Sequence, residues 1–135
     1  MKELTVTAEL DKLDEVLAFV DTSLEEMDCP MKTQMQIDIA VEELFVNIAH
    51  YAYTPNVGEA TIRTETQEAP RALAVTFIDS GIPYDPLAKD DPDVTLSAEE
   101  RKIGGLGIFM VKKSMDAMEY EYKNGQNVLT IRKEF

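Results

Sequence analysis

The sequence is short of the residues that mark several common classes of protein. Its 135 residues include one cysteine, Cys29, and one histidine, His50. No intrachain disulfide can therefore form, and the Cys/His spacing of a zinc site is absent. Basic residues are also scarce, since 13 Lys and Arg stand against 26 Asp and Glu, a formal charge of −13. A nucleic-acid surface needs clustered Lys and Arg, so we expect the partner to be a protein.

Long hydrophobic runs are absent as well. Residues 1–5 lack the apolar stretch of a signal peptide, and no segment approaches the roughly 20 apolar residues of a membrane helix. We therefore expect a soluble protein of the reducing cytoplasm, with which a single cysteine agrees. A chain of 135 residues fits one domain, so we expect a single domain over 1–135.

The spacing of apolar residues in the first half predicts a strand and two helices. A weakly alternating stretch over 4–8 is expected to form an edge strand. The helix after it should have this apolar stripe: Leu10, Leu13, Leu17, Val20, Leu24 and Met27. After a break at Cys29-Pro30, a second helix is expected over about 32–53. Its apolar stripe is Ile37, Val41, Leu44, Ile48 and Tyr51.

The second half predicts two hairpins, a polar loop and a short helix. Strand-like runs at 59–66 and 72–78 form the first hairpin, and 85–102 is a polar loop before a helix over about 108–116. The last hairpin turns at Asn124-Gly125. That turn pairs Tyr122 with Asn127, Tyr120 with Leu129 and Met118 with Ile131. We expect an α/β fold, a two-layer α+β sandwich in which helices cover one face of a mixed, mostly antiparallel sheet and the other face is wetter.

Three polar side chains lie along one edge of the second predicted helix. At about 100° per residue, Glu43, Asn47 and His50 fall within an arc of about 60°. Asn47 can ligate a hard cation such as Mg²⁺, and Glu43 can position or deprotonate a nucleophile. A polar helix edge that faces water fits the same pattern, and a single histidine is more often a surface or packed residue than a ligand.

Asp79 ends a predicted strand on its inward face. It shares parity with Leu73, Val75 and Phe77, so a carboxylate is turned toward the interior and needs a donor. An adenine exocyclic amine is one candidate, and Gly81 would let a flat base approach the backbone. The alternative is a turn that closes the strand, in which Asp79 bonds nearby backbone amides.

A glycine-rich segment, Gly104-Gly105-Leu106-Gly107, precedes the short helix. Its amides and the helix N-terminus can cradle phosphates, and a hinge or a helix cap explains it equally well. It is not a Walker loop, which ends in Gly-Lys-Ser/Thr, nor a dinucleotide loop that follows a strand. Basic residues that can neutralise a polyphosphate, or simply face solvent, flank it: Arg101, Lys102, Lys112 and Lys113.

Taken in order, these motifs resemble the Bergerat-type ATP site of the superfamily that includes gyrase, MutL and histidine kinases. In detail the chain is similar to the small anti-sigma-factor serine kinases of bacteria. Residues 42–53 match their N box, 79–86 match their Asp-x-Gly-x-Pro-Phe-Asp-Pro block, and 104–112 match their glycine block. The resemblance spans nearly the whole chain, and the three blocks together are highly specific for ATP binding.

The resemblance implies a role for each matching residue. Glu43 would be the general base, Asn47 the Mg²⁺ ligand and Asp79 the carboxylate that reads adenine, while 85–106 would be the ATP lid. The full set expected to bind the nucleotide is Asn47, His50, Asp79, Gly81, Gly104, Gly105, Gly107 and Asn127.

Three positions depart from the family pattern. Tyr51 stands where the family often has His before Ala-Tyr, and His50 occupies the place of a phosphate-contacting Lys in histidine kinases. Asn127 stands where a Thr often supports the adenine-reading Asp. Because the hairpin register puts Asn127 on the inward face, an amide would replace the hydroxyl there.

The function that the resemblance implies is a serine/threonine kinase that uses Mg-ATP to phosphorylate a small anti-sigma-factor antagonist. Such a protein can also sequester a sigma factor, and the family resemblance implies a homodimer. The second hypothesis is a non-catalytic module in which ATP creates a docking surface for a partner, and the departures at Tyr51 and Asn127 favour it. A detached histidine-kinase domain is less suitable, because His50 lies inside the expected site and there is no room for a phosphoacceptor helix pair.

Overall fold

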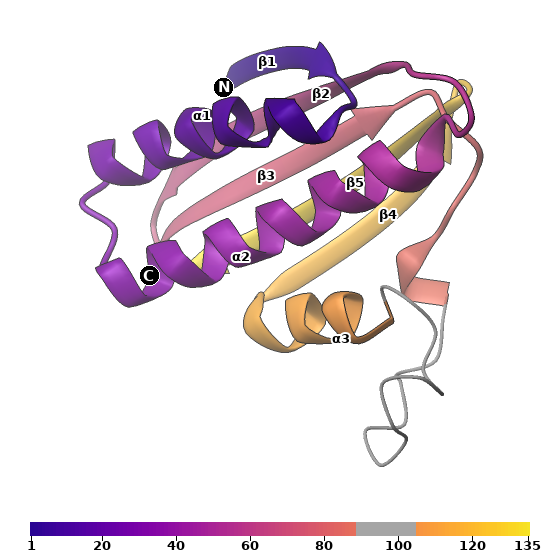
Figure 1. Cartoon of the computed structure of the whole chain (residues 1–135). Helices are drawn as coiled ribbons and strands as arrows, with labels where there is room; N and C mark the ends of the chain where they lie inside the picture. Colours follow the sequence, from indigo (N-terminus) through magenta and orange to yellow (C-terminus); the bar gives the residue numbers. More distant parts are fainter. Residues whose placement is uncertain (89–104) are drawn as a thin grey trace.

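The computed structural model describes residues 1–88 and 105–135, which form a helical layer and a sheet (Figure 1). In chain order the elements are β1 (Lys2–Thr7), α1 (Leu13–Glu26), α2 (Met31–Asn47), β2 (Glu59–Glu68), β3 (Arg71–Asp79), α3 (Gly105–Ser114), β4 (Ala117–Lys123) and β5 (Gln126–Glu134). Short 3-10 turns lie at Leu10–Lys12 and Pro86–Ala88, and a π-helical turn at Ile48–Ala52. In these ranges no helix is both long and apolar enough to cross a membrane. The α/β class is confirmed.

The strands of the described residues form one sheet in the order β1-β2-β3-β5-β4. Each neighbouring pair is antiparallel, so the sheet, expected to be mixed and mostly antiparallel, is antiparallel throughout these strands. The edge position of β1 and the β2–β3 hairpin are confirmed. This order places β3 at the centre of the sheet with β5 beside it, and these two strands carry Asp79 and Asn127 at directly opposite positions.

The helices cover one face of the sheet, as expected, and the core lies between the two layers (Figure 1). Alternate residues of β3 point into it, and Val75 and Phe77 are each only 1% exposed. The helices contribute side chains at helical spacing, of which the most buried are Val16, Val20, Leu24, Ile37, Val41 and Phe45. Full burial of one such side chain stabilises the fold by about 1.5–3 kcal/mol, so these residues hold α1 and α2 in a fixed relation to the sheet.

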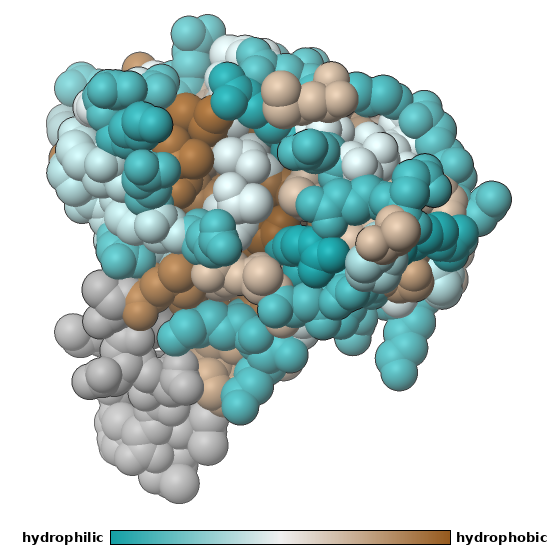
Figure 2. All heavy atoms as spheres, turned by 180° about the vertical axis from the view of Figure 1, so that it is seen from behind, coloured by the Kyte–Doolittle hydropathy of each residue, from teal (hydrophilic) through white to brown (hydrophobic). Residues whose placement is uncertain are grey.

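The opposite face of the sheet is polar, as predicted. Threonine hydroxyls bond across neighbouring strands there, Thr5 with Thr61 at 2.9 Å and Thr76 with Thr130 at 3.0 Å. Arg63 also donates to Glu3 on this face, at 2.5 Å. Figure 2, which looks onto this side, shows hydrophilic residues over most of it with hydrophobic patches between them. The functional pocket is therefore expected on the helical side.

The C-terminal hairpin has the register predicted from its sequence. Met118 pairs with Ile131, Tyr120 with Leu129 and Tyr122 with Asn127. The turn residues Asn124 and Gly125 both have positive φ, 55° and 76°, as a two-residue type I′ turn requires. The register therefore brings Asn127 to the inner face of β5, where it is 6% exposed.

The second helix differs from its prediction at its C-terminal end. The regular α-helix stops at Asn47 and a π-helical turn follows. The wider turn changes the phase of the residues after Asn47, and Tyr51, expected in the apolar stripe, is 46% exposed. Leu10 also leaves the predicted stripe of the first helix, because it lies in a 3-10 turn before α1 and is 51% exposed.

Candidate functional site

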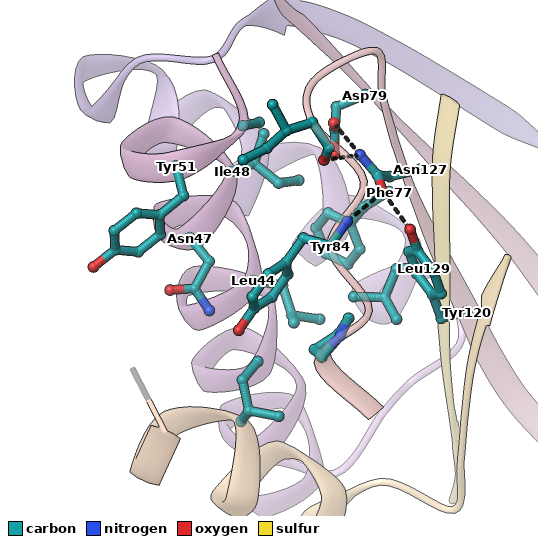
Figure 3. Close-up of a pocket in the computed structure, with 14 residues that line it drawn as sticks. Leu44, Asn47, Ile48, Tyr51, Phe77, Asp79, Tyr84, Tyr120, Asn127 and Leu129 are labelled. Carbon is teal, nitrogen blue, oxygen red and sulfur yellow. Dashed lines mark hydrogen bonds between the residues drawn. The ribbon is translucent and has the colours of Figure 1, made fainter. Parts of the chain in front are cut away.

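A pocket opens between the C-terminal half of α2, the end of β3 and the β4–β5 hairpin (Figure 3). The space between its lining residues is about 570 Å³, with the open mouth included. Most of its wall is apolar and comes from residues such as Leu44, Ile48, Phe77, Ile108 and Leu129. The polar side chains on the wall are Asn47, Asp79, Asn127, Tyr51, Tyr84 and Tyr120. Such a lining suits a flat apolar ligand held by a few polar contacts.

Asp79 lies at the inner end of this pocket, where β3 stops. It is 6% exposed, and its Oδ1 accepts hydrogen bonds from the Gly81 amide and from Asn127 Nδ2, each at 2.9 Å. Within the described residues no donor is recorded for Oδ2. The turn that the second interpretation expects is therefore present, through Oδ1, and the adenine contact of the first interpretation stays a prediction for the other oxygen.

Asn127 connects Asp79 to the loop after β3. Its Nδ2 donates to Asp79 Oδ1 and to the Ile82 carbonyl, both at 2.9 Å. Its Oδ1 accepts from the Tyr84 amide at 3.1 Å and from the Tyr120 hydroxyl. An Asn side chain has two donors and two acceptor sites, so all are used and the orientation of the amide is fixed by its neighbours.

The end of α2 forms the opposite wall. Asn47, the last residue of the α-helix, lines the pocket, and Tyr51 lies one turn further on (Figure 3). His50 is exposed and does not line the pocket; its ring makes an edge contact with Tyr51. The structure therefore brings Asn47 to the site, while the π-helical turn leaves His50 outside it.

Glu43 and the glycine block meet beside the pocket. Gly107, in the first turn of α3, packs so closely on Glu43 that a Cβ there would lie 1.9 Å from Glu43 Oε1. Burial, followed by the charge of Glu42, raises the pKa of Glu43. The positive end of the helix dipole lies at the N-terminus of α3, where a carboxylate is favourable. The candidate base Glu43 therefore lies beside the backbone that is the candidate phosphate-binding segment.

Gly81 has a structural reason to be glycine. A Cβ at this position would lie 2.3 Å from the Ala52 carbonyl oxygen, and the next residue, Ile82, donates its amide to that oxygen at 3.0 Å. The sequence suggested that Gly81 lets a base approach the backbone, but the group that approaches it here is the end of the π-helical turn. Gly81 serves the site through its amide, which bonds Asp79.

Several predicted residues lie outside the described part of the chain. They include Gly104, Arg101 and Lys102, and most of the expected ATP lid over 85–106. Gly105, by contrast, begins α3. Tyr84 and Tyr120 line the pocket but were not predicted as site residues. The predicted hairpin register did hold a signal for Tyr120, since it puts that ring diagonal to Asn127 on the same face.

This arrangement can bind a nucleotide in two parts. The apolar slot and Asp79 Oδ2, which has no recorded donor in residues 1–88 and 105–135, suit a flat base that carries a hydrogen-bond donor, while Asn47, Glu43 and the start of α3 suit a phosphate chain. No cluster of three or more His, Cys, Asp or Glu side chains that could hold a metal occurs among the described residues. A Mg²⁺ ion often takes one protein oxygen and completes its shell with phosphates and water, and the Asn47 amide oxygen fits that pattern.

The chain is similar to known proteins over most of its length. A family model described as a histidine kinase-like ATPase domain matches residues 6–133. The chain is 26% identical over 100 residues to the serine/threonine-protein kinase BtrW of Bordetella bronchiseptica, which covers 74% of this chain and 70% of the relative. It is 30% identical over 95 residues to the serine-protein kinase RsbW of Bacillus cereus, which covers 67% of this chain and 58% of the relative. This chain thus spans little more than half the length of RsbW.

A solved structure supports the fold. A chain in the crystal structure of the SiaB–SiaC complex from Pseudomonas aeruginosa superimposes with a TM-score of 0.57 at 16% identity, over 98% of this chain and 89% of that one. The family model covers the chain from the end of β1 almost to the end of β5, including the helix of Asn47, the strand of Asp79 and the glycine block. The chain belongs to the histidine kinase-like ATPase domain family, and ATP is the ligand that this membership implies for the pocket.

Proposed function

We propose that this protein is an ATP-dependent serine/threonine kinase that phosphorylates a small anti-sigma-factor antagonist and so acts as an anti-sigma factor. The observation that supports the proposal most is the contact between Glu43 and Gly107 beside the pocket, because it puts a carboxylate where the phosphate chain would end. The kinase names of two relatives support the same reaction class.

Binding of the base rests on the inner end of the pocket. Asp79 Oδ2 accepts a hydrogen bond from the exocyclic amine of adenine. The side chains of Phe77, Ile48 and Leu129 cover the faces and edges of the ring. Burial of the apolar ring contributes affinity, and the single polar contact sets the orientation of the base. The base is therefore fixed at one end, which directs the phosphates toward α3.

The phosphates are held at the other end of the pocket. The backbone amides in the first turn of α3 are free of intrahelical partners and point toward the site of negative charge, and Asn47 offers an oxygen to Mg²⁺. Mg²⁺, when bound, neutralises the charge on the phosphates. These residues act by positioning the phosphates, and positioning is a main contribution of a protein to phosphoryl transfer.

Glu43 orients the incoming hydroxyl of the substrate and accepts its proton. The raised pKa of Glu43 brings its basicity closer to neutral pH, where a general base is most effective. The hydroxyl oxygen then forms a bond to the γ-phosphorus, the bond from that phosphorus to the β–γ bridging oxygen breaks, and ADP leaves. Glu43 thereby joins the substrate to the phosphate end of the pocket.

The proposal includes the partners that the family resemblance implies. The acceptor of the phosphoryl group is a Ser or Thr of the antagonist, the second partner is a sigma factor, and the chain acts as a homodimer in the cytoplasm. The acidic composition, with a formal charge of −13, agrees with a protein partner and not with DNA or RNA.

The test is incubation with Mg-ATP and the antagonist encoded nearby, followed by phosphoprotein detection. Glu43→Gln is the informative variant, because it keeps the shape of the side chain and removes its basicity. We expect phosphorylation to fall at least about a hundredfold, as for loss of a general base, while ATP binding persists. A Glu43→Gln protein as active as the wild type would contradict the role of Glu43.

The alternative is a non-catalytic module in which bound ATP creates the docking surface. The observation that favours it is the exposed position of His50 in the π-helical turn, outside the pocket, where histidine kinases have a phosphate-contacting Lys. Titration of the partner in the presence and absence of Mg-ATP distinguishes the two. Partner affinity that depends on ATP, with no phosphoprotein formed, would select the module over the kinase.

A further inference from the structure

The hydrogen bonds around Asn127 leave Asp79 with one carboxylate oxygen for a ligand. Oδ1 already accepts from Asn127 Nδ2 and from the Gly81 amide, each at 2.9 Å. A carboxylate oxygen has about two lone-pair sites, so Oδ1 is saturated. Asp79 lines the pocket, and Oδ2, for which no donor is recorded among the described residues, is the oxygen left for a ligand.

The Asn127 amide cannot flip without losing its hydrogen bonds. Its Oδ1 accepts from the Tyr120 hydroxyl and the Tyr84 amide, and its Nδ2 donates to the Ile82 carbonyl as well as to Asp79. A flipped amide would place two acceptors against its oxygen and two donors against its nitrogen. Burial raises the pKa of Tyr120, so this hydroxyl keeps its proton and remains a donor to Asn127.

A single accepting oxygen discriminates between purines. Adenine presents one exocyclic donor, its N6 amine, and one oxygen is enough for it. Guanine presents two adjacent donors, N1–H and the N2 amine, which pair with a carboxylate only if both of its oxygens are open. If guanine took the position of adenine instead, its O6 would face Asp79, acceptor against acceptor. Either pose leaves a buried polar group of guanine unpaired.

We infer that Asn127, positioned by Tyr120, is the specificity-determining residue that makes this pocket accept adenine and reject guanine. Asn127 does this without touching the base, because it occupies Asp79 Oδ1. Figure 3 shows the arrangement, with Tyr120, Asn127 and Asp79 joined in sequence along one wall of the pocket. This inference rests on the proposed nucleotide site and does not depend on phosphotransfer.

The test is a set of binding titrations with ATP, GTP and ITP on the full chain. Hypoxanthine, the base of ITP, has N1–H but lacks the N2 amine, so it separates the effect of the second donor from a general loosening of the pocket. For the wild type we expect ATP to bind about tenfold to a hundredfold more tightly than GTP, the effect of one unpaired buried group. ITP should bind at least as tightly as GTP.

Asn127→Leu keeps the size of the side chain and removes its donor, which opens Oδ1. We expect the preference for ATP over GTP to fall about tenfold or more, and GTP to overtake ITP because two donors now find two oxygens. Ratios between ligands are compared within one variant, so a general loss of affinity cancels. An unchanged ATP-to-GTP ratio in Asn127→Leu, with GTP still no tighter than ITP, would overturn the inference.

Tyr120→Phe gives a second, milder variant in case Asn127→Leu does not fold. It removes one of the two donors that hold Asn127 Oδ1, and the preference for ATP should fall several-fold. Tyr122→Phe is the matched control, since Tyr122 lies two residues further along β4 and is 46% exposed. Equal ATP-to-GTP affinity ratios in Tyr120→Phe and Tyr122→Phe would contradict the positioning role of Tyr120. A wild type that binds none of the three nucleotides would instead refute the nucleotide site itself.

Discussion

Gly107 of α3 lies directly against Glu43 of α2, so close that a Cβ on Gly107 would be 1.9 Å from Glu43 Oε1. The two residues are far apart in the sequence and belong to different motifs. The contact exists because α3 packs beside α2, where Ile108 and Val111 enter the core. The missing side chain of Gly107 therefore leaves room for a carboxylate, and this gives the glycine block a role in addition to the phosphate binding proposed for it.

Gly107→Ala should displace Glu43 and leave the fold intact. The atom in the way is the end of a flexible side chain, so Glu43 can rotate aside at little cost to stability. We expect phosphorylation of the antagonist to fall about tenfold to a hundredfold, since a misplaced catalytic group loses that much rate. The check is the initial rate of phosphoprotein formation, together with a thermal unfolding curve close to that of the wild type.

A double variant shows whether the Gly107→Ala change acts through Glu43. In a Glu43→Ala background the carboxylate is gone, so adding Gly107→Ala should reduce the residual rate by less than about twofold. Additive losses in the two variants would mean that Gly107 acts on the phosphates alone and would refute the positioning role.

The rate of phosphotransfer should fall in acid because Glu43 must be ionised to act. Burial and the neighbouring charge of Glu42 raise the pKa of Glu43, so the fall begins at a higher pH than for an ordinary glutamate. Replacing the exposed Glu42 by Gln removes the repulsion and should move the acid limb to lower pH. The measurement is the rate across pH 5 to 8; a limb that does not move in Glu42→Gln would contradict this assignment.

Asp21 and Asp38 face each other between α1 and α2, and their interaction predicts a pH-dependent stability. Burial, then a hydrogen bond and the charge of Asp21, raise the pKa of Asp38 to about 7. The folded state thus holds a proton that the unfolded chain releases near pH 4. Stability from this pair is complete below about pH 4 and is lost as the pH rises to about 7.

Asp38→Asn should remove this dependence. The variant is expected to be more stable than the wild type at pH 8, by on the order of 1 kcal/mol after a discount for partial exposure, and to differ less at pH 4. Urea unfolding at the two pH values measures it. Asp14→Asn, an exposed change on α1, is the control. If the Asp38→Asn protein lost as much stability as the wild type between pH 4 and 8, the pair would not hold the proton.

The sequence was most informative where local geometry decides the structure. The register of the C-terminal hairpin follows from Asn124-Gly125, because both residues readily take positive φ. The inward direction of Asp79 follows from strand parity with Val75 and Phe77. These two features together place Asp79 opposite Asn127, once β3 and β5 are known to be neighbours.

The remaining features depend on contacts that local patterns do not encode. The pairing of β3 with β5 joins strands that are far apart in the sequence. The π-helical turn at Ile48–Ala52 interrupts the helix at a place where the apolar spacing of the sequence continues unchanged. That turn puts Ala52 against Gly81 and His50 in solvent. The predicted register places Tyr120 diagonal to Asn127 on the same face, but a register alone does not show that the two side chains form a hydrogen bond.

The most direct test of the nucleotide site is a calorimetric titration of Mg-ATP into the wild type and into Asp79→Asn. Asn has the same shape but can present a donor to the adenine amine, so the one polar contact of the base is lost or becomes repulsive. We predict saturable binding by the wild type and affinity weaker by about a hundredfold in Asp79→Asn, the scale of a lost hydrogen bond to a charged group, with both proteins folded. Equal affinity in the two proteins, or no binding by the wild type, would contradict the account.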